Sequence, residues 1–221
     1  MTTDPPGRAA LLAGATGLVG TRVLERLAAD RSRGAITVLA RRPIPVPERT
    51  ELRVIDFDAL DTLDAVPAVE AVFCCLGTTI GRAGSQQAFR RVDHDYVLAL
   101  ARRARAAGAT HFLLVSAVGA DAGSRVFYNR VKGETERDLQ AMGWPSLTIL
   151  RPSLLDGDRA EFRAGERAAL AVLRPLSALV PAAWRPVPAD AVASAMVGAA
   201  TTPTPGLRII ESAELVRRGA A

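Results

Sequence analysis

Tyr128 and Lys132 stand four positions apart, and Ser116 precedes them at the end of an apolar run. On a helix, residues i and i+4 lie on one face, about one turn apart. A free phenol exchanges its proton poorly at neutral pH, and a neighbouring ammonium favours the phenolate. A serine hydroxyl can hold the carbonyl or alcohol oxygen of a substrate. Together the three residues predict a proton-relay site for hydride transfer.

Lys132 is also the only lysine of the chain, because every other position among its 28 lysine and arginine residues holds arginine. A compact ammonium can contact nucleotide ribose hydroxyls and a phenol at once, which a planar guanidinium does less readily. The alternative is an ordinary amphipathic helix carrying Tyr128 and Lys132, with Ser116 ending a strand for turn reasons. We predict that the pair acts in catalysis or anchors a cofactor.

A glycine-rich loop, Gly14-Ala15-Thr16-Gly17-Leu18-Val19-Gly20, follows the first predicted strand and opens the first predicted helix. Such glycines allow a tight turn and a close approach of the backbone to a pyrophosphate, which the helix N-terminus attracts. Any tight strand–helix turn is the alternative. The residues predicted to bind the dinucleotide here are Gly14, Thr16, Gly17, Leu18, Val19 and Gly20.

Arg41 and Arg42 end the second predicted strand, where an NAD site usually offers a carboxylate to the ribose 2′-hydroxyl. Guanidinium groups suit a 2′-phosphate through charge and paired hydrogen bonds. A solvated strand end in an arginine-rich protein is the alternative. We predict that the protein binds NADP(H) in preference to NAD(H).

Two further strand ends are predicted to face the cofactor. Asp56 can accept a hydrogen bond from the adenine amino group with Phe57 beside the ring, although Asp56 capping the next turn is an equal alternative. After the fourth predicted strand, backbone and hydroxyl groups would lie beside a cofactor ribose, unless the segment is a plain turn. Those residues are Leu76, Gly77, Thr78 and Thr79.

Strand and helix patterns alternate along the chain. Strand-like runs lie at residues 9–13, 36–40, 52–55, 71–76, 111–115, 146–150 and 207–210, and helical patterns at 18–29, 86–107, 125–142 and 190–200. This order predicts an α/β fold, a single Rossmann-type doubly wound parallel sheet of about seven strands with helices on both faces. We expect one domain over residues 1–221, in which residues 153–206 cover the substrate.

Composition excludes several other classes of function. The net charge is +5, but the arginines are scattered and no aromatic residues are interleaved with them, which argues against nucleic-acid binding. Adjacent Cys74 and Cys75 make a structural disulfide improbable, and with two histidines they give no metal-ligand spacing. No signal peptide or membrane-spanning run is recognised, so a soluble cytoplasmic protein is expected.

The assembled motifs resemble the short-chain dehydrogenase/reductase superfamily in its extended and atypical branches, and more closely the Tat-interacting-protein oxidoreductases. Besides the glycine loop, Ser116, Tyr128 and Lys132, the resemblance is carried by Phe73-Cys74-Cys75-Leu76-Gly77-Thr78-Thr79, Arg91-Val92-Asp93-His94-Asp95-Tyr96-Val97-Leu98, Gly119-Ala120-Asp121, Val131-Lys132-Gly133-Glu134 and Leu150-Arg151-Pro152. It runs from about Leu11 to Glu214.

This resemblance implies a Rossmann fold, NADPH binding, a reductase activity and a catalytic set of Ser116, Tyr128 and Lys132. It also implies that Pro152, Ser153 and Leu154 lie along the nicotinamide. The chain departs from the animal members in lacking their N-terminal extension. It also departs at Ala117 and Val118, where those members have polar residues.

Three functions are compatible with these residues. The first is an NADPH-dependent reductase of a small carbonyl compound, acting as a monomer or a homodimer. The second is an epimerase or dehydratase of a nucleotide-linked sugar, although such enzymes usually have a larger C-terminal substrate domain. The third is a non-catalytic NADP(H) sensor that binds a partner protein, which would not need a proton relay.

Overall fold

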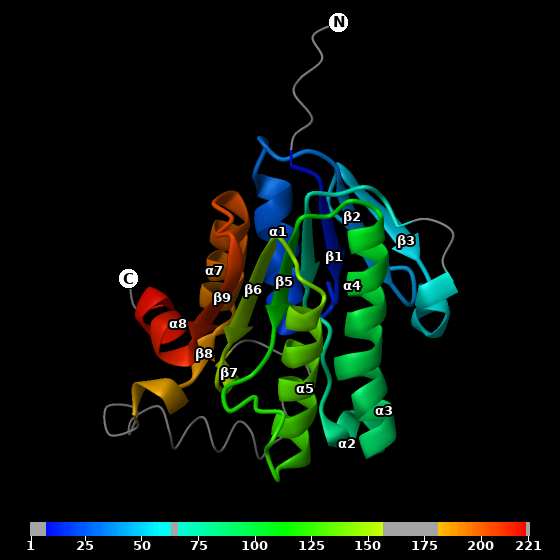
Figure 1. Ribbon diagram of the computed structural model, residues 1–221. Helices are drawn as coiled ribbons and strands as arrows, with labels where there is room; N and C mark the ends of the chain where they lie inside the picture. Colours follow the sequence, from blue (N-terminus) through cyan, green and yellow to red (C-terminus); the bar gives the residue numbers. More distant parts are fainter. Residues whose placement is uncertain (1–7, 63–65, 157–180, 220–221) are drawn as a thin grey trace, which may run out of the picture.

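The computed structural model of the protein describes residues 8–62, 66–156 and 181–219, and its centre is a seven-stranded sheet (Figure 1). The strands lie in the order β3-β2-β1-β4-β5-β6-β9, and all neighbouring pairs are parallel. They are β1 (Ala10–Ala13), β2 (Ile36–Ala40), β3 (Thr50–Val54), β4 (Ala71–Cys74), β5 (His111–Val115), β6 (Ser146–Arg151) and β9 (Gly206–Glu211). The predicted fold class is confirmed.

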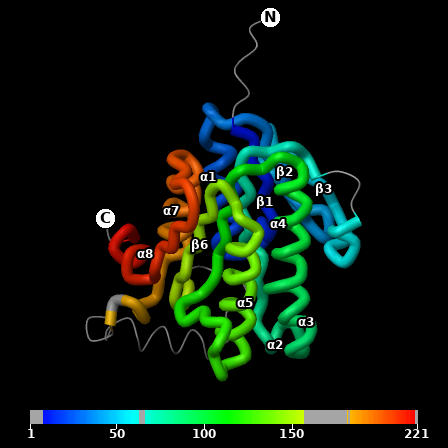
Figure 2. Tube along the Cα trace, in the orientation of Figure 1, coloured from blue at the N-terminus to red at the C-terminus, as the bar shows by residue number. Residues whose placement is uncertain are grey.

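Helices cover both faces of this sheet (Figures 1 and 2). On one face α1 (Leu18–Ala29) packs beside α7 (Ala189–Thr201), and α8 (Ser212–Gly219) lies against α7. On the other face lie α4 (Tyr96–Ala106) and α5 (Phe127–Ala141). Because β1, β2 and β4 are buried along their whole length, the core forms two apolar layers, one on each side of the sheet.

The strand order creates a switch point between β1 and β4. From β1 the chain continues to its neighbour β2, and from β4 it continues in the opposite direction, to β5. At such a point the loops that follow the two strands diverge at their carboxyl ends, and doubly wound sheets bind ligands there. We call the carboxyl ends of β1, β2, β3, β4 and β5, with the loops that follow them, the switch-point edge.

The long helix predicted over residues 86–107 is divided in the structure. It consists of α3 (Gln86–Arg90), a π-helical turn η2 (Arg91–Asp95) and then α4. A π turn inserts one residue into a helix, and such insertions are frequent at functional sites. The apolar pattern continues on both sides of the insertion, so hydrophobic periodicity alone does not reveal it.

The segment 153–206, predicted to cover the substrate, has several parts. It begins with β7 (Leu155–Asp156), which pairs with β8 (Val187–Pro188) in a small second sheet. A short 3₁₀ turn, η3 (Ala182–Trp184), precedes β8. Helix α7 follows β8 and packs into the core, so this part of the segment is not a cover. Residues 157–180, with the helical pieces predicted there, lie outside the described residues.

Other elements also differ from expectation. Strand β4 ends at Cys74 and not at Leu76. A short 3₁₀ helix η1 (Phe57–Thr62) and a single helical turn α2 (Ile80–Ala83) follow β3 and β4, and α8 was not predicted. In the part of the chain that is described, no helix has the length and apolar character needed to cross a membrane.

Candidate active site

The glycine loop packs directly against the end of β4. Gly14 has a φ of +89°, and a Cβ built on it would lie 2.3 Å from the carbonyl oxygen of Cys75. A Cβ built on Gly20 would lie 2.0 Å from the carbonyl oxygen of Gly14. Side chains at either position would therefore collide with backbone, and the glycines are required for the β1–α1 turn to meet β4.

The N-terminus of α1 faces this turn without a side-chain cap. Gly17 occupies the N-cap position and makes no side-chain hydrogen bond, while Leu18 begins the helix. The first amide groups of a helix lack intrahelical acceptors and attract anions through the helix dipole. Thr16 is exposed beside them, whereas Val19 is buried in the core. An uncapped helix start behind a glycine-rich loop fits a dinucleotide pyrophosphate.

Arg41 and Arg42 directly follow β2 at the switch-point edge, and both are exposed. Within residues 8–62, 66–156 and 181–219 neither guanidinium has an ion-pair partner. Unpaired guanidinium groups are free to bind a phosphate. The prediction of a 2′-phosphate contact is compatible with this placement.

At the end of β3 the predicted adenine contact of Asp56 stays a prediction. Asp56 is exposed, and its Oδ1 accepts a hydrogen bond from the backbone nitrogen of Asp58 at 2.9 Å. It therefore caps the η1 turn, which is the alternative role considered above. Phe57 is only 4% exposed, and its ring packs on Tyr96 with centroids 5.6 Å apart. Its ring belongs to the core.

The loop after β4 is held by polar contacts on both sides. The backbone nitrogen of Thr78 donates to Oδ2 of Asp93 at 2.9 Å. Thr79 caps α2 by accepting a hydrogen bond from the backbone nitrogen of Arg82 at 3.2 Å. Gly77 is exposed between Thr78 and the half-buried Leu76. This loop thus presents mainly backbone at the switch-point edge.

Ser116 directly follows β5, where its backbone nitrogen donates to the carbonyl oxygen of Leu150 at 2.8 Å. The residue is 5% exposed, and its Oγ has no hydrogen-bond partner among the residues that the structure describes. A buried hydroxyl without a partner is costly, and it is a strong candidate to bind a ligand oxygen.

Tyr128 and Lys132 lie one turn apart near the start of α5. Tyr128 is half-buried, and its ring packs on Phe89 of α3 with centroids 5.3 Å apart. Lys132 is buried, and its Nζ lies 2.8 Å from Oδ1 of Asp93. Burial lowers the pKa of Lys132, but the charges of Asp93 and Tyr128 outweigh burial and hold this pKa above its usual range. The lysine is an ammonium at neutral pH.

The loop that joins Ser116 to Tyr128 lies tightly on α5. A Cβ built on Gly133 would lie 2.2 Å from the backbone nitrogen of Ala122. The backbone nitrogen of Asp121 donates to the carbonyl oxygen of Asn129 at 3.1 Å. Gly133 therefore lets this loop approach the helix, which fixes the path of the chain between Ser116 and Tyr128.

The residues after β6 differ in what they present. Pro152 is buried, and its carbonyl oxygen accepts a hydrogen bond from Val118 at 2.8 Å. The hydroxyl of Ser153 donates to the carbonyl oxygen of Arg185, so it is already engaged. Leu154 is 41% exposed. Their predicted position along a nicotinamide stays a prediction.

Asp93 was missed as a site residue, although the sequence holds a signal for it. Phe89, Asp93 and Val97 follow one another at helical spacing, and all three are buried. A carboxylate at a core position needs a partner, because a lone buried charge is very unfavourable. The partner, Lys132, lies in another helix, so spacing along the chain does not identify it.

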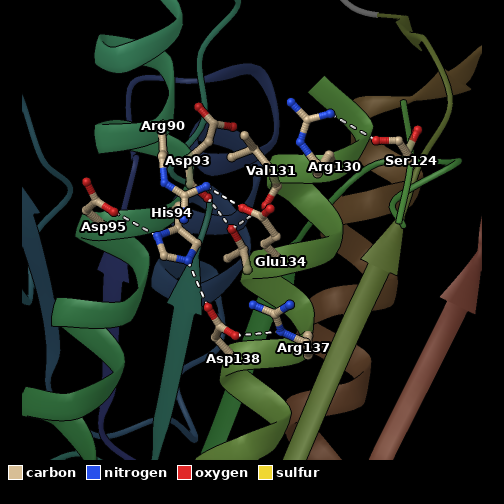
Figure 3. A network of polar contacts seen from close by, with 11 residues as sticks. Arg90, Asp93, His94, Asp95, Ser124, Arg130, Val131, Glu134, Arg137 and Asp138 are labelled. Carbon is tan, nitrogen blue, oxygen red and sulfur yellow. Dashed lines mark hydrogen bonds and ion pairs between the residues drawn. The ribbon is translucent and has the colours of Figure 1, made fainter. Parts of the chain in front are cut away.

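A polar seam continues from Asp93 between η2 and α5 (Figure 3). The Nδ1 of His94 lies 2.7 Å from Oδ1 of Asp95, and its Nε2 lies 3.0 Å from Oδ2 of Asp138. Arg90 and Glu134 form a further ion pair across the same seam. These contacts fix η2 against the helix that carries Tyr128 and Lys132.

Comparison with known families identifies the fold and its ligand. Residues 14–203 match the model of an NAD(P)H-binding family. The chain is 33% identical to Protein HTATIP2 of Rattus norvegicus, covering 96% of this chain and 89% of that protein. It is 35% identical to the mitochondrial Protein FMP52 of Eremothecium gossypii, covering 94% of this chain and 95% of that protein.

Solved structures with the same fold are more distant in sequence. UDP-glucose 4-epimerase of Thermotoga maritima, solved with UDP-glucose, has a TM-score of 0.70 and 17% identity, covering 93% of this chain and 77% of that one. The human epimerase family protein SDR39U1, solved with NADPH, has a TM-score of 0.65 and 17% identity, with the same coverage of 93% and 77%. At this identity the likeness shows the fold alone.

The comparison corrects the expected location. The FMP52 relatives from Eremothecium gossypii, Aspergillus niger and Emericella nidulans are all named mitochondrial. These names contradict the expectation of a cytoplasmic protein, which is therefore wrong. It rested on the lack of a recognised secretory signal or membrane span, and a mitochondrial protein needs neither.

The glycine loop, the uncapped start of α1 and the residues of α5 thus agree with the family that the comparisons identify. The chain belongs to the NAD(P)H-binding family, as an atypical short-chain dehydrogenase/reductase of the HTATIP2 family.

Proposed function

We propose that the protein is an NADP(H)-dependent oxidoreductase that interconverts a small carbonyl compound and its alcohol. The observation that supports this most is the composition of the switch-point edge. Ser116, which directly follows β5, has a buried hydroxyl with no hydrogen-bond partner among the described residues, and α5 carries the half-buried phenol of Tyr128 and the ammonium of Lys132. A hydroxyl, a phenol and an ammonium are the groups that proton transfer to a carbonyl oxygen requires.

The residues present fit the cofactor. Loop and helix amides around Gly17 would hold the pyrophosphate, and Arg41 with Arg42 would hold a 2′-phosphate. When bound, the nicotinamide supplies or accepts a hydride. A preference for NADP(H) over NAD(H) is the part of this proposal that rests on Arg41 and Arg42.

The three polar residues have different roles in positioning the carbonyl oxygen and transferring a proton to it. The hydroxyl of Ser116 donates a hydrogen bond to the carbonyl oxygen and holds it in place. As a C–H bond forms at the carbonyl carbon, the electron pair of the C=O bond moves to this oxygen, which takes the phenolic proton of Tyr128. The ammonium of Lys132 stabilises the phenolate left on Tyr128, which then recovers a proton from solvent.

The surroundings of this edge favour an apolar carbonyl compound over a nucleotide-linked sugar. The segments that follow β4, β5 and β6 each expose one large apolar side chain: Ile80 at 36%, Val126 at 58% and Leu154 at 41%. Exposed apolar residues in the segments that follow these strands favour a ligand with apolar groups around one reactive oxygen. Aldehydes, ketones and quinones with short alkyl or aromatic groups are of this kind.

A cofactor-consumption screen tests this function. NADPH absorbance is followed with a panel of such aldehydes, ketones and quinones, and separately with UDP-sugars. We expect consumption with at least one apolar carbonyl compound. If the protein binds NADPH tightly but consumes none across the panel, the oxidoreductase proposal fails in favour of a cofactor sensor. Conversion of a UDP-sugar without net consumption would instead identify an epimerase.

A further inference from the structure

Asp93 is a buried carboxylate that the proposed chemistry does not use. Its side chain is 0% exposed, and Oδ1 lies 2.8 Å from Nζ of Lys132. Its Oδ2 accepts a hydrogen bond from the backbone nitrogen of Thr78 at 2.9 Å. Its carbonyl oxygen accepts another from Thr135 of α5 at 3.0 Å, within the seam that Figure 3 shows. One residue of the π turn thus binds both α5 and the loop after β4.

The ion pair of Asp93 and Lys132 lies directly against the loop after β4. A Cβ built on Gly77 would lie 3.4 Å from Oδ1 of Asp93 and 3.7 Å from Nζ of Lys132. Gly77 itself is exposed. The pair is therefore separated from the surface at this point by a single residue without a side chain. A ligand lying on the loop would come close to the ammonium.

A buried ammonium needs such a partner. Taking an ammonium out of water favours its neutral amine, and the loss of one partner from a buried ion pair leaves an uncompensated charge. Only 7% of the Lys132 side chain is exposed, so water cannot replace Asp93. A neutral amine would no longer stabilise a phenolate on Tyr128.

We propose that Asp93 is a positioning residue that keeps Lys132 in its ammonium form beside Tyr128 and ties it to the loop after β4. The consequence for hydride transfer rests on the proposed function. The charge state of Lys132 does not, and it can be measured without substrate or cofactor.

The groups that face Lys132 come from three elements. Asp93 faces it from η2, Tyr128 from its own helix and the thiol of Cys74 from β4. Burial raises the pKa of Cys74 to about 12, so this thiol is neutral. Among these groups in the described residues, Asp93 is therefore the one that supplies negative charge at neutral pH.

The lone lysine makes the test direct. Protein grown with lysine labelled with ¹³C at Cε, and carrying no lysine in any added tag, gives one lysine signal whose chemical shift reports protonation. In the wild-type protein we expect this signal to stay at the ammonium position up to about pH 11, above the ordinary lysine pKa. In Asp93→Asn, which keeps shape but removes the charge, we expect burial to prevail and the midpoint to fall to about pH 7, because burial without a charged partner lowers a lysine pKa by about 3 to 5 units.

Matched variants separate charge from packing. Asp138→Asn removes another carboxylate of the same seam, one that contacts His94 and not Lys132. This variant should leave the titration midpoint of Lys132 unchanged. Asp93→Glu restores a carboxylate and should return the signal towards the wild-type behaviour. Circular dichroism establishes that each variant is folded.

Two results would overturn the proposal. One is a folded Asp93→Asn protein whose lysine titrates as in the wild type. The other requires no variant: a wild-type lysine that titrates at or below its ordinary value, about pH 10.4, has no stabilising partner. The second result remains decisive if Asp93→Asn does not fold.

The hydrogen bond between Asp93 and the loop after β4 can be tested separately. Hydrogen exchange of the Thr78 amide should be slow in the wild type and at least tenfold faster in Asp93→Ala, which removes the oxygen that accepts from that amide. Asp138→Asn should leave it unchanged. Equal exchange in the wild type and Asp93→Ala would show that Asp93 does not hold the loop.

Discussion

The two halves of the switch-point edge are built differently. The inner half, at the ends of β4 and β5 and the start of α5, consists of buried polar groups, such as Ser116 and the Lys132–Asp93 pair. The outer half, at the ends of β2 and β3, presents exposed groups such as Arg41 and Asp56. Buried, bonded groups are held in position before a ligand arrives, whereas exposed side chains are ordered when it binds. The inner half therefore suits chemistry, and the outer half suits recognition by charge.

The largest expected effect comes from the inner half. Tyr128→Phe removes only the phenolic hydroxyl and should lower kcat by about 1,000-fold, because the proton donor is lost. NADPH affinity should stay within about threefold. Steady-state kinetics on a substrate from the screen, with calorimetry for NADPH, measure both. The matched control is Tyr96→Phe, whose hydroxyl bonds Asp58 away from Lys132 and should leave kcat unchanged. Near-normal turnover in Tyr128→Phe would remove this residue from the mechanism.

The glycine loop between the halves should be the most sensitive to added volume. Gly20→Ala would place a Cβ 2.0 Å from the carbonyl oxygen of Gly14, and we expect it to lower the free energy of unfolding by about 3 kcal/mol. Gly17→Ala is the control, because its nearest contact would be 3.4 Å, and it should cost less than about 1 kcal/mol. Urea unfolding measures both. Similar free energies of unfolding for the two variants would show that close packing does not determine the conformation of the glycine loop.

A histidine at the opposite edge of the sheet should control acid stability without affecting either half. Burial lowers the pKa of His111 to about 4, below its unfolded value of about 6.5. The folded state therefore favours the neutral imidazole. The free energy of unfolding should be constant above about pH 6.5 and fall by about 3 kcal/mol as the pH drops to about 4. His111→Gln should lose this step in urea unfolding, and a variant with the wild-type pH profile would assign the step to other groups.

The outer half should give the smallest effect. Arg41→Ala/Arg42→Ala should weaken NADPH binding by about tenfold, or about 1.4 kcal/mol, and leave NADH binding unchanged. In the wild type, NADP(H) should bind at least tenfold more tightly than NAD(H). Calorimetric titration of both cofactors measures this. Equal weakening of NADPH and NADH would mean that the two arginines do not recognise the 2′-phosphate.

The same contrast explains which features the sequence predicts. Helix α1 and strands β2 and β5 have the predicted bounds, because their apolar periodicity and flanking glycines are local signals. The glycine loop, Arg41 and Ser116 also stand at strand ends as expected.

The parts that the sequence did not predict depend on contacts between distant segments. The burial of Phe57 follows from its packing on Tyr96, and the role of Asp93 from a lysine in another helix. The π turn at Arg91–Asp95 leaves the apolar pattern unbroken. Local periodicity indicates which face of a helix or strand is apolar. It does not indicate which buried polar side chains from different elements contact each other.

We expect NADP(H) to bind at the switch-point edge, close to Lys132. The single ¹³Cε lysine signal tests this directly when NADPH is added to the wild-type protein. We expect the signal to shift as NADPH binds and to saturate at the affinity that calorimetry gives. In Arg41→Ala/Arg42→Ala the same shift should require about tenfold more NADPH. A lysine signal that does not move at saturating NADPH would place the cofactor elsewhere and contradict the account.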